Sequence, residues 1–337
     1  MIDTIHDRIA EVWDDNRNRI IALGTVVATV GALALGGQLL KHDPLAVVHG
    51  VESLFGPDSP TCAPVPEKAV DSMFQDLVTA HLNTDSAHMK QITPDIARPV
   101  AAKYGFSLRD TGDYKSALQA ATTPQQAQAT IRRLGEAFGL NVRTNSTNLS
   151  VLRTDGVELA DFLALVPTEA LAKINPPPIK LEATLLPGET GRVTLTGVYH
   201  MVDLSLVEQY VGYNLPHELL GHVVQITGCA PGSQFKDGQI AAANPKGYGQ
   251  YTKDGRQLEG VDASKLTLDI LDYHGLTNTA EDFATTADGI VTGQGDFCEQ
   301  RNVPVTHKMA VVLARYNSLY PGLGDYYRDL RNIRCGT

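Results

Sequence analysis

The stretch PHELLGH, residues 216–222, places two histidines and a glutamate in one short segment. Imidazole nitrogens bind zinc in proteins, and a carboxylate beside a metal-bound water can accept a proton from it. In the zinc-binding pattern H-E-x-x-H, the two histidines lie four residues apart on one face of a helix. Here His217 and His222 are five residues apart, so the first question is whether this longer spacing can hold a metal.

A regular α-helix does not bring these two histidines together. Residues four apart lie about 40° apart around the helix axis, whereas residues five apart lie about 140° apart. A π-bulge would absorb the extra residue and return both side chains to one face, and Gly221 would ease that distortion. The alternative is a regular helix on which Glu218 and His222 form a polar pair while His217 points away.

The residues HELLGH, 217–222, resemble the H-E-x-x-G-H motif of the dipeptidyl peptidase III family of zinc exopeptidases, in which the longer spacing binds zinc. The resemblance covers only these six residues and does not extend to the large two-lobed body of that family. It implies that His217 and His222 bind one zinc ion and that Glu218 is the general base.

A catalytic zinc ion needs a third protein ligand, and its fourth position is left to water. Residues 273–289, YHGLTNTAEDFATTADG, read as a capped helix with carboxylates in its first turn. The Glu-Asp-Phe-Ala portion resembles the segment that supplies the third ligand in the gluzincins, which implies that Glu281 is this ligand. Many gluzincins have an acidic residue where Thr285 stands, so Asp282 and Asp288 are the candidates for supporting a ligand histidine. The alternative is that Glu281 and Asp282 are only favourable charges at a helix N-terminus.

Stabilising an oxyanion during hydrolysis requires a hydrogen-bond donor near the reacting carbonyl. Tyr273 and His274, just before the expected Glu281 helix, are the first candidates, and His307, Tyr326 and Tyr327 are further ones. For most of these side chains the alternative is packing in the core or at an interface.

Residues 20–40 carry no charge over a length that would cross a bilayer core of about 30 Å as a helix. Arg8, Arg17 and Arg19 precede this segment, whereas only Lys41 follows it closely, which favours a cytoplasmic N-terminus and an extracytoplasmic body. The alternatives are a signal peptide cleaved after the Ala-Leu-Ala sequence within the segment, and a buried helix of a soluble protein.

All four cysteines follow the apolar segment, and they contain no C-x-x-C pair. An even number in an oxidising compartment favours disulfides, and the alternative is buried free thiols. A Cys229–Cys298 bridge would tie together the two elements that carry the metal ligands. Cys62 and Cys335, near the two ends of the folded body, would then form the second pair.

The remaining pattern suggests how the chain is organised. Residues 56–68 are rich in Pro and Ser, which is typical of a linker. Helical spacing of apolar residues predicts helices in the ranges 67–82, 94–104 and 124–138. The expected divisions are a cytoplasmic segment 1–19, an anchor 20–40, a linker 41–66, a helical portion 67–170 and a zincin-like metal-binding domain 171–337.

Alternating apolar residues in the range 179–206, broken by Pro187–Gly188 and Thr190–Gly191, predict a β-hairpin. The strand nearest to the histidine helix, residues 192–206, is expected to border the cleft and to pair with an extended peptide substrate. Together with the expected helices, these strands predict an α+β fold that consists of a small mixed sheet, metal-binding helices and a helical N-terminal portion.

Composition narrows the classes of function. The formal net charge is −10, and the Lys and Arg residues are scattered, so nucleic acid is not an expected partner. The sequence predicts a membrane-anchored, extracytoplasmic peptidase that uses one Zn²⁺ ion and hydrolyses a peptide or protein. The alternative is a non-catalytic envelope protein that binds a partner and contains a structural metal or none.

Overall fold

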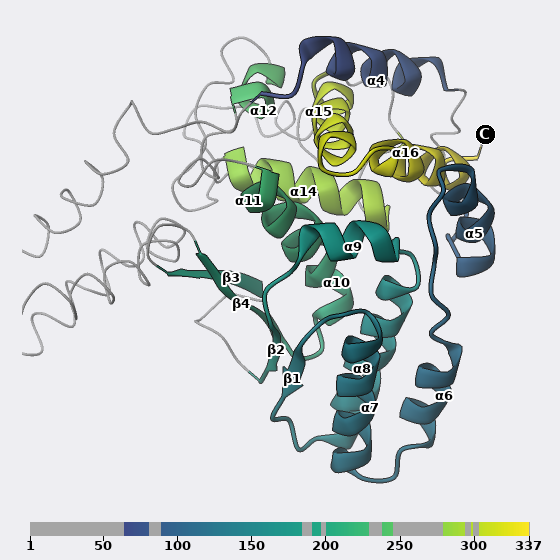
Figure 1. Cartoon of the computed structure of the whole chain (residues 1–337), viewed down its shortest axis with the longest axis vertical. Coiled ribbons are helices and arrows are strands. Elements are labelled where there is room, and N and C mark those ends of the chain that lie inside the picture. The colour runs from purple at the N-terminus through teal and green to yellow at the C-terminus, as the bar shows by residue number, and fades with distance from the viewer. Residues whose placement is uncertain are drawn as a thin grey trace, which may run out of the picture.

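The computed structural model describes residues 64–80, 89–183, 191–196, 200–228, 238–244, 279–293, 298 and 303–336. These residues form a mostly helical domain with one small sheet, which confirms the predicted α+β class (Figure 1). Within them, no helix combines the length and the apolar character needed to cross a membrane. The expected anchor, residues 20–40, lies outside the described residues.

Six helices form most of the first part, and local sequence explains where several of them begin. Proline occupies the first helical position of both α5 and α7, where a missing N–H costs nothing. The Asn148 side chain accepts hydrogen bonds from the backbone N–H groups of Ser150 and Val151 and so caps α8. The helices are α4 (Glu67–Thr79), α5 (Pro94–Lys103), α6 (Gly112–Ala120), α7 (Pro124–Ala137), α8 (Leu149–Leu163) and α9 (Thr168–Ile174).

The sheet contains four strands in the order β1-β2-β4-β3. They are β1 (Val142–Thr144), β2 (Ile179–Glu182), β3 (Gly191–Thr196) and β4 (His200–Val207). β1 pairs with β2 and β2 with β4 in parallel, whereas β3 and β4 are antiparallel. Among the strands that the structure describes, β3 therefore forms one edge of the sheet, and β4 lies inside it.

The strand predictions need two corrections. The hairpin predicted for residues 179–206 does not pair β2 with β3, because β4 lies between them. The single edge strand predicted for residues 192–206 is two strands, of which only β3 is at the edge. The short connection after β3 requires an antiparallel neighbour, and this neighbour is β4. The other side of β4 is then available for parallel pairing with β2.

The predicted metal ligands lie in the second part, which is again mostly helical. The chain passes from α10 directly into a π-helix, η3, and then into α11. α14 packs along η3, and α15 packs against both α14 and α4. The elements are α10 (Val211–Leu215), η3 (Pro216–Val223), α11 (Val224–Gly228), α12 (Gly238–Ala243), α14 (Thr279–Thr292), α15 (Val303–Leu319) and α16 (Leu323–Arg334).

The hydrophobic core runs through both parts without a break. β1 belongs to the segment expected to be helical, yet it pairs with β2 from the next segment. One cluster of buried side chains extends from Val65 to Cys335 and includes residues on both sides of position 170. The described residues of the ranges 67–170 and 171–337 therefore share one core.

The disulfide prediction is wrong. Cys298 and Cys335 are bonded to each other, with a Cα–Cα distance of 5.6 Å, so neither can pair with Cys229 or Cys62. The physical reason is that the end of α16 returns to the end of α14, where the Arg334 guanidinium donates to the Val291 carbonyl at 2.7 Å. Cys229 and Cys62 lie outside the described residues.

Candidate metal centre

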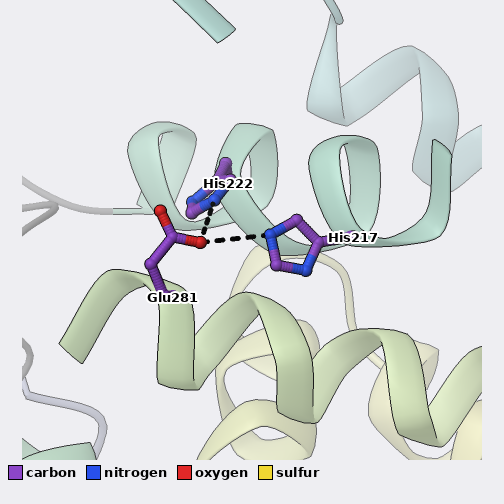
Figure 2. A group of neighbouring side chains, drawn as sticks. All are labelled: His217, His222 and Glu281. Atoms are coloured by element: carbon purple, nitrogen blue, oxygen red, sulfur yellow. Dashed lines mark hydrogen bonds and ion pairs between the residues drawn. The ribbon is translucent and has the colours of Figure 1, made fainter. Parts of the chain in front are cut away.

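Three of the predicted ligands converge at one place, where α14 packs along η3. His217 Nε2 and His222 Nε2 each lie 3.2 Å from the same oxygen, Glu281 Oε2. The two imidazole rings are 4.9 Å apart, and their planes are nearly perpendicular. Figure 2 shows both rings on one helix facing the carboxylate of the other. The predicted convergence of His217, His222 and Glu281 is therefore confirmed.

The histidines meet because the helix between them is π-helical over its whole length, from Pro216 to Val223. Hydrogen bonds from residue i to residue i+5 bring residues five apart to the same face, as the histidine spacing requires. Pro216 favours the change of register, since it has no N–H to continue the α-helical ladder of α10. The predicted departure from a regular helix is confirmed, and it extends further than a single bulge.

Gly221 has a different role from the one expected. Among the described residues, those with positive φ do not include Gly221, so its backbone freedom is not what η3 uses. A Cβ atom on Gly221 would lie 2.6 Å from both Cα and Cβ of Ala284 on α14. Gly221 therefore allows the two ligand-bearing helices to approach closely enough for the histidines to reach Glu281.

The first turn of α14 is held by a buried ion pair. The Lys308 ammonium on α15 lies 2.8 Å from the Asp282 carboxylate, and the two side chains are 1% and 2% exposed. Asp282 directly follows Glu281, so this ion pair fixes the helix turn that presents the ligand. The expected support of a ligand histidine by Asp282 stays a prediction.

Asp288 lies deeper along α14 and is also buried. Burial raises the pKa of the Tyr316 hydroxyl well above its usual range, and the nearby Asp288 carboxylate adds to this shift. Asp288 thus lies close to α15, and its expected support of a ligand histidine stays a prediction. Thr285 occupies the position that is acidic in many gluzincins, and its side chain is buried.

Glu218, the predicted base, is 6% exposed and packs under the start of the edge strand. A Cβ atom at Gly191, the first residue of β3, would lie 2.5 Å from Glu218 Oε1. The absence of a side chain at Gly191 therefore leaves the space that the Glu218 carboxylate occupies. The sheet edge and the predicted base are in direct contact.

The three converging residues could hold a metal ion. Their ligand atoms all lie within 4.8 Å of one another. Donors about 2.0–2.1 Å from a tetrahedral zinc ion are about 3.3 Å apart, close to the 3.2 Å between each imidazole nitrogen and the carboxylate oxygen. Two imidazoles and one carboxylate form a donor set used by catalytic zinc and by non-haem iron. All three side chains are 13–17% exposed, which leaves the site accessible to a small ligand.

The described residues among the predicted oxyanion donors do not join this group. Tyr273 and His274 lie outside the described residues. Tyr326 and Tyr327 are buried in the core, and Tyr326 donates its hydroxyl proton to the Leu165 carbonyl. The His307 ring packs against the ring of Phe74 at 5.7 Å. Packing, which was the alternative for these last three side chains, is their observed role.

Sequence reasoning missed Gly191, Lys308 and Tyr316 at this site. Lys308 could have been noticed, because a lysine within the apolar sequence of α15 needs a buried partner. Gly191 and Tyr316 carried no comparable indication, since their roles depend on which elements pack against η3.

Comparison of the chain with protein-family models, with curated proteins and with solved structures finds no match. The described residues form a mostly helical α+β domain with a His-His-Glu group that could bind a metal.

Proposed function

We propose that this protein is a zinc-dependent peptidase of the gluzincin type. The proposal rests on one observation: His217, His222 and Glu281 converge within 4.8 Å on two packed helices, in the arrangement expected of catalytic zinc ligands. Further support comes from Glu218, which neighbours His217 in the chain and packs against the edge of the sheet. The HELLGH motif adds the resemblance to a family of zinc exopeptidases.

Different residues of the chain have different roles in the proposed hydrolysis. His217, His222 and Glu281 would hold the zinc ion, which when bound polarises a peptide carbonyl and makes a bound water more acidic. Glu218 accepts a proton on its carboxylate and delivers it to the leaving amine. Burial of Glu218 beneath Gly191 limits the orientations of this carboxylate, and so keeps the base in one position between the two proton transfers.

The substrate is proposed to be a peptide in extended conformation that pairs with β3. β3 is an edge strand, so one side of its backbone does not pair with any described strand. Extended peptides add to such edges through main-chain hydrogen bonds. Because Gly191 of β3 contacts Glu218, a peptide bound along this strand passes beside the proposed base.

The proposed location is extracytoplasmic, with residues 20–40 as a single membrane anchor. The apolar length of this segment and its flanking arginines support the proposal. The Cys298–Cys335 disulfide is consistent with an oxidising compartment. The second candidate function is a non-catalytic envelope protein in which the same three residues hold a structural metal.

A comparison of two glutamine variants tests the peptidase. Glu218→Gln removes the proposed base, and Glu208→Gln removes another buried carboxylate, whose Oε2 accepts a hydrogen bond from Ser146. Full-length protein saturated with zinc is incubated with a mixture of free and N-acetylated peptides, and cleavage is measured by mass spectrometry. Glu218→Gln is expected to retain zinc and to lose at least about 100-fold in hydrolysis, with Glu208→Gln close to wild type. Zinc-loaded wild type without hydrolysis, or an unaffected Glu218→Gln variant, favours the non-catalytic protein.

A further inference from the structure

A tyrosine from a third helix bonds to the backbone of η3 between the two histidines. The Tyr316 hydroxyl on α15 donates a hydrogen bond to the Leu220 carbonyl at 2.9 Å. Both residues are fully or almost fully buried. The contact lies inside the π-helical segment and not at its end.

The hydrogen bonds of η3 explain why this contact matters. In an α-helix the Leu220 carbonyl would accept the N–H of Val224, four residues later. Here the Val224 N–H bonds to the Gly221 carbonyl instead. A buried carbonyl that loses its helical donor is costly unless another donor replaces it. The Tyr316 hydroxyl supplies such a donor to the Leu220 carbonyl in the π-helical register.

Tyr316 is held rigidly where it makes this contact. Its ring packs against Tyr327 at 5.5 Å, in an edge-to-face arrangement. Burial and the nearby Asp288 carboxylate raise the pKa of the hydroxyl, so it remains a proton donor throughout the physiological range. α15 is also tied to α14 by the Lys308–Asp282 ion pair. One helix therefore contacts both elements that carry the metal ligands.

We infer that Tyr316 is a positioning residue for the metal centre, because its hydroxyl stabilises the π-helical register that brings His217 and His222 to Glu281. The inference rests on the metal site of the proposed function but not on peptide hydrolysis. Without the hydroxyl, the Leu220 carbonyl gains by recovering an α-helical donor, and this register turns the histidines about 140° apart. Loss of the hydroxyl thus weakens metal binding without removing a ligand.

The chain contains a matched control for this effect. Tyr326 is also fully buried, and its hydroxyl donates to a main-chain carbonyl, that of Leu165, at 2.8 Å. Leu165 belongs to neither ligand-bearing helix. Tyr326→Phe and Tyr316→Phe therefore each remove one buried hydroxyl–carbonyl hydrogen bond and leave an aromatic ring in place.

The test uses the full-length protein and Zn²⁺ alone, with affinity measured by chelator competition and ligand geometry by the visible absorption of the Co²⁺ form. Tyr316→Phe is expected to weaken zinc binding by about tenfold or more and to alter the Co²⁺ spectrum. Tyr326→Phe is expected to stay within about twofold of wild type, with an unchanged spectrum. Equal effects of the two substitutions, or wild-type binding by Tyr316→Phe, overturn the inference.

The same set of proteins also distinguishes two other outcomes: a wild type that binds no metal, and a Tyr316→Phe variant that does not fold. If wild type binds neither zinc nor cobalt, the metal centre itself is refuted, independently of Tyr316. If Tyr316→Phe does not fold, both variants are refolded in trimethylamine N-oxide, which strengthens effective burial. A Tyr316→Phe protein that still does not fold beside a folded Tyr326→Phe protein overturns the inference, because the hydroxyl is then needed for the whole fold.

Discussion

The two helices that supply the proposed metal ligands are built in different ways. η3 carries two histidines five residues apart and departs from α-helical hydrogen bonding along its whole length. α14 is a regular helix that presents a single ligand, Glu281, from its first turn. η3 is supported by contacts that other elements make with its backbone and glycine, whereas α14 is held by a buried ion pair of side chains.

This difference predicts which kind of substitution would displace each proposed ligand. The position of Glu281 depends on charge, since Lys308 neutralises the neighbouring Asp282 in the core. The positions of His217 and His222 depend on backbone register, which is sensitive to space and to single hydrogen bonds. Substitutions around α14 should therefore mainly lower the stability of the fold. Substitutions around η3 should mainly lower the affinity for metal.

The largest effect on stability is expected from Lys308→Met. This change leaves the buried Asp282 carboxylate without the ammonium that neutralises it, and breaking such a pair costs about 3–5 kcal/mol. Urea unfolding measures the loss. The double variant Lys308→Met/Asp282→Asn removes both charges and should recover much of the stability. A single variant as stable as wild type would remove the distinction between the two helices.

Gly221→Ala is expected to act mainly on metal binding. The added methyl group would meet the backbone of Ala284, which cannot rotate away, so η3 and α14 must separate. Overpacking of this kind costs about 1–3 kcal/mol, and the separation should lower zinc affinity by about 100-fold. Gly238→Ala is the control, because a Cβ there meets nothing within 4 Å. Chelator competition measures both affinities, and equal values would contradict the proposed close approach.

Asp155 is a further buried carboxylate, and its partner is a backbone N–H group and not a charged side chain. Asp155 on α8 accepts the N–H of Gln209, which lies in the turn before α10 and η3. Burial raises the pKa of Asp155 to about 6, with Glu158 and Glu208 adding to the shift. A carboxyl whose pKa is raised by folding favours the folded state only when protonated. Its contribution to stability is therefore present at low pH and is lost as the pH rises through about 6.

Asp155→Asn should reverse this loss. The amide oxygen of asparagine can still accept the Gln209 N–H, and it carries no charge at any pH. The variant is expected to be more stable than wild type by about 2 kcal/mol at pH 7.5 and nearly equal to it at pH 4. Urea unfolding at both pH values measures the difference. A variant that is destabilised most at pH 7.5 would show that the Asp155 charge is favourable in the fold.

The smallest effect is expected from Gly191→Ala. The new methyl group would push the Glu218 carboxylate out of the position that it occupies beneath Gly191. Hydrolysis should fall by about tenfold because the base is displaced, while zinc affinity stays unchanged because no ligand moves. Steady-state kinetics and chelator competition separate the two. A parallel loss of zinc would show that β3 supports the ligands as well as the base.

The sequence predicts the local part of the site well. His217 and His222 are close in the chain, so helix geometry predicts a π-type departure if both bind one metal ion, and the resemblance to the gluzincin segment implies Glu281 as the third ligand. The long-range parts could not be read in the same way. The Cys298–Cys335 pairing and the position of β4 between β2 and β3 depend on how distant elements pack. The same holds for Tyr316, whose proposed role depends on the hydrogen bond that its hydroxyl donates from α15 to the Leu220 carbonyl of η3.

Binding of one zinc ion by His217, His222 and Glu281 is measured by metal analysis of the purified protein. Purified full-length protein, His217→Ala and Glu281→Ala are each dialysed against the same low zinc concentration and measured for zinc per chain and for affinity. We expect one tightly bound zinc ion in wild type and a loss of affinity of at least about 100-fold in both variants. Wild type without stoichiometric zinc, or variants that bind zinc as wild type does, would contradict it.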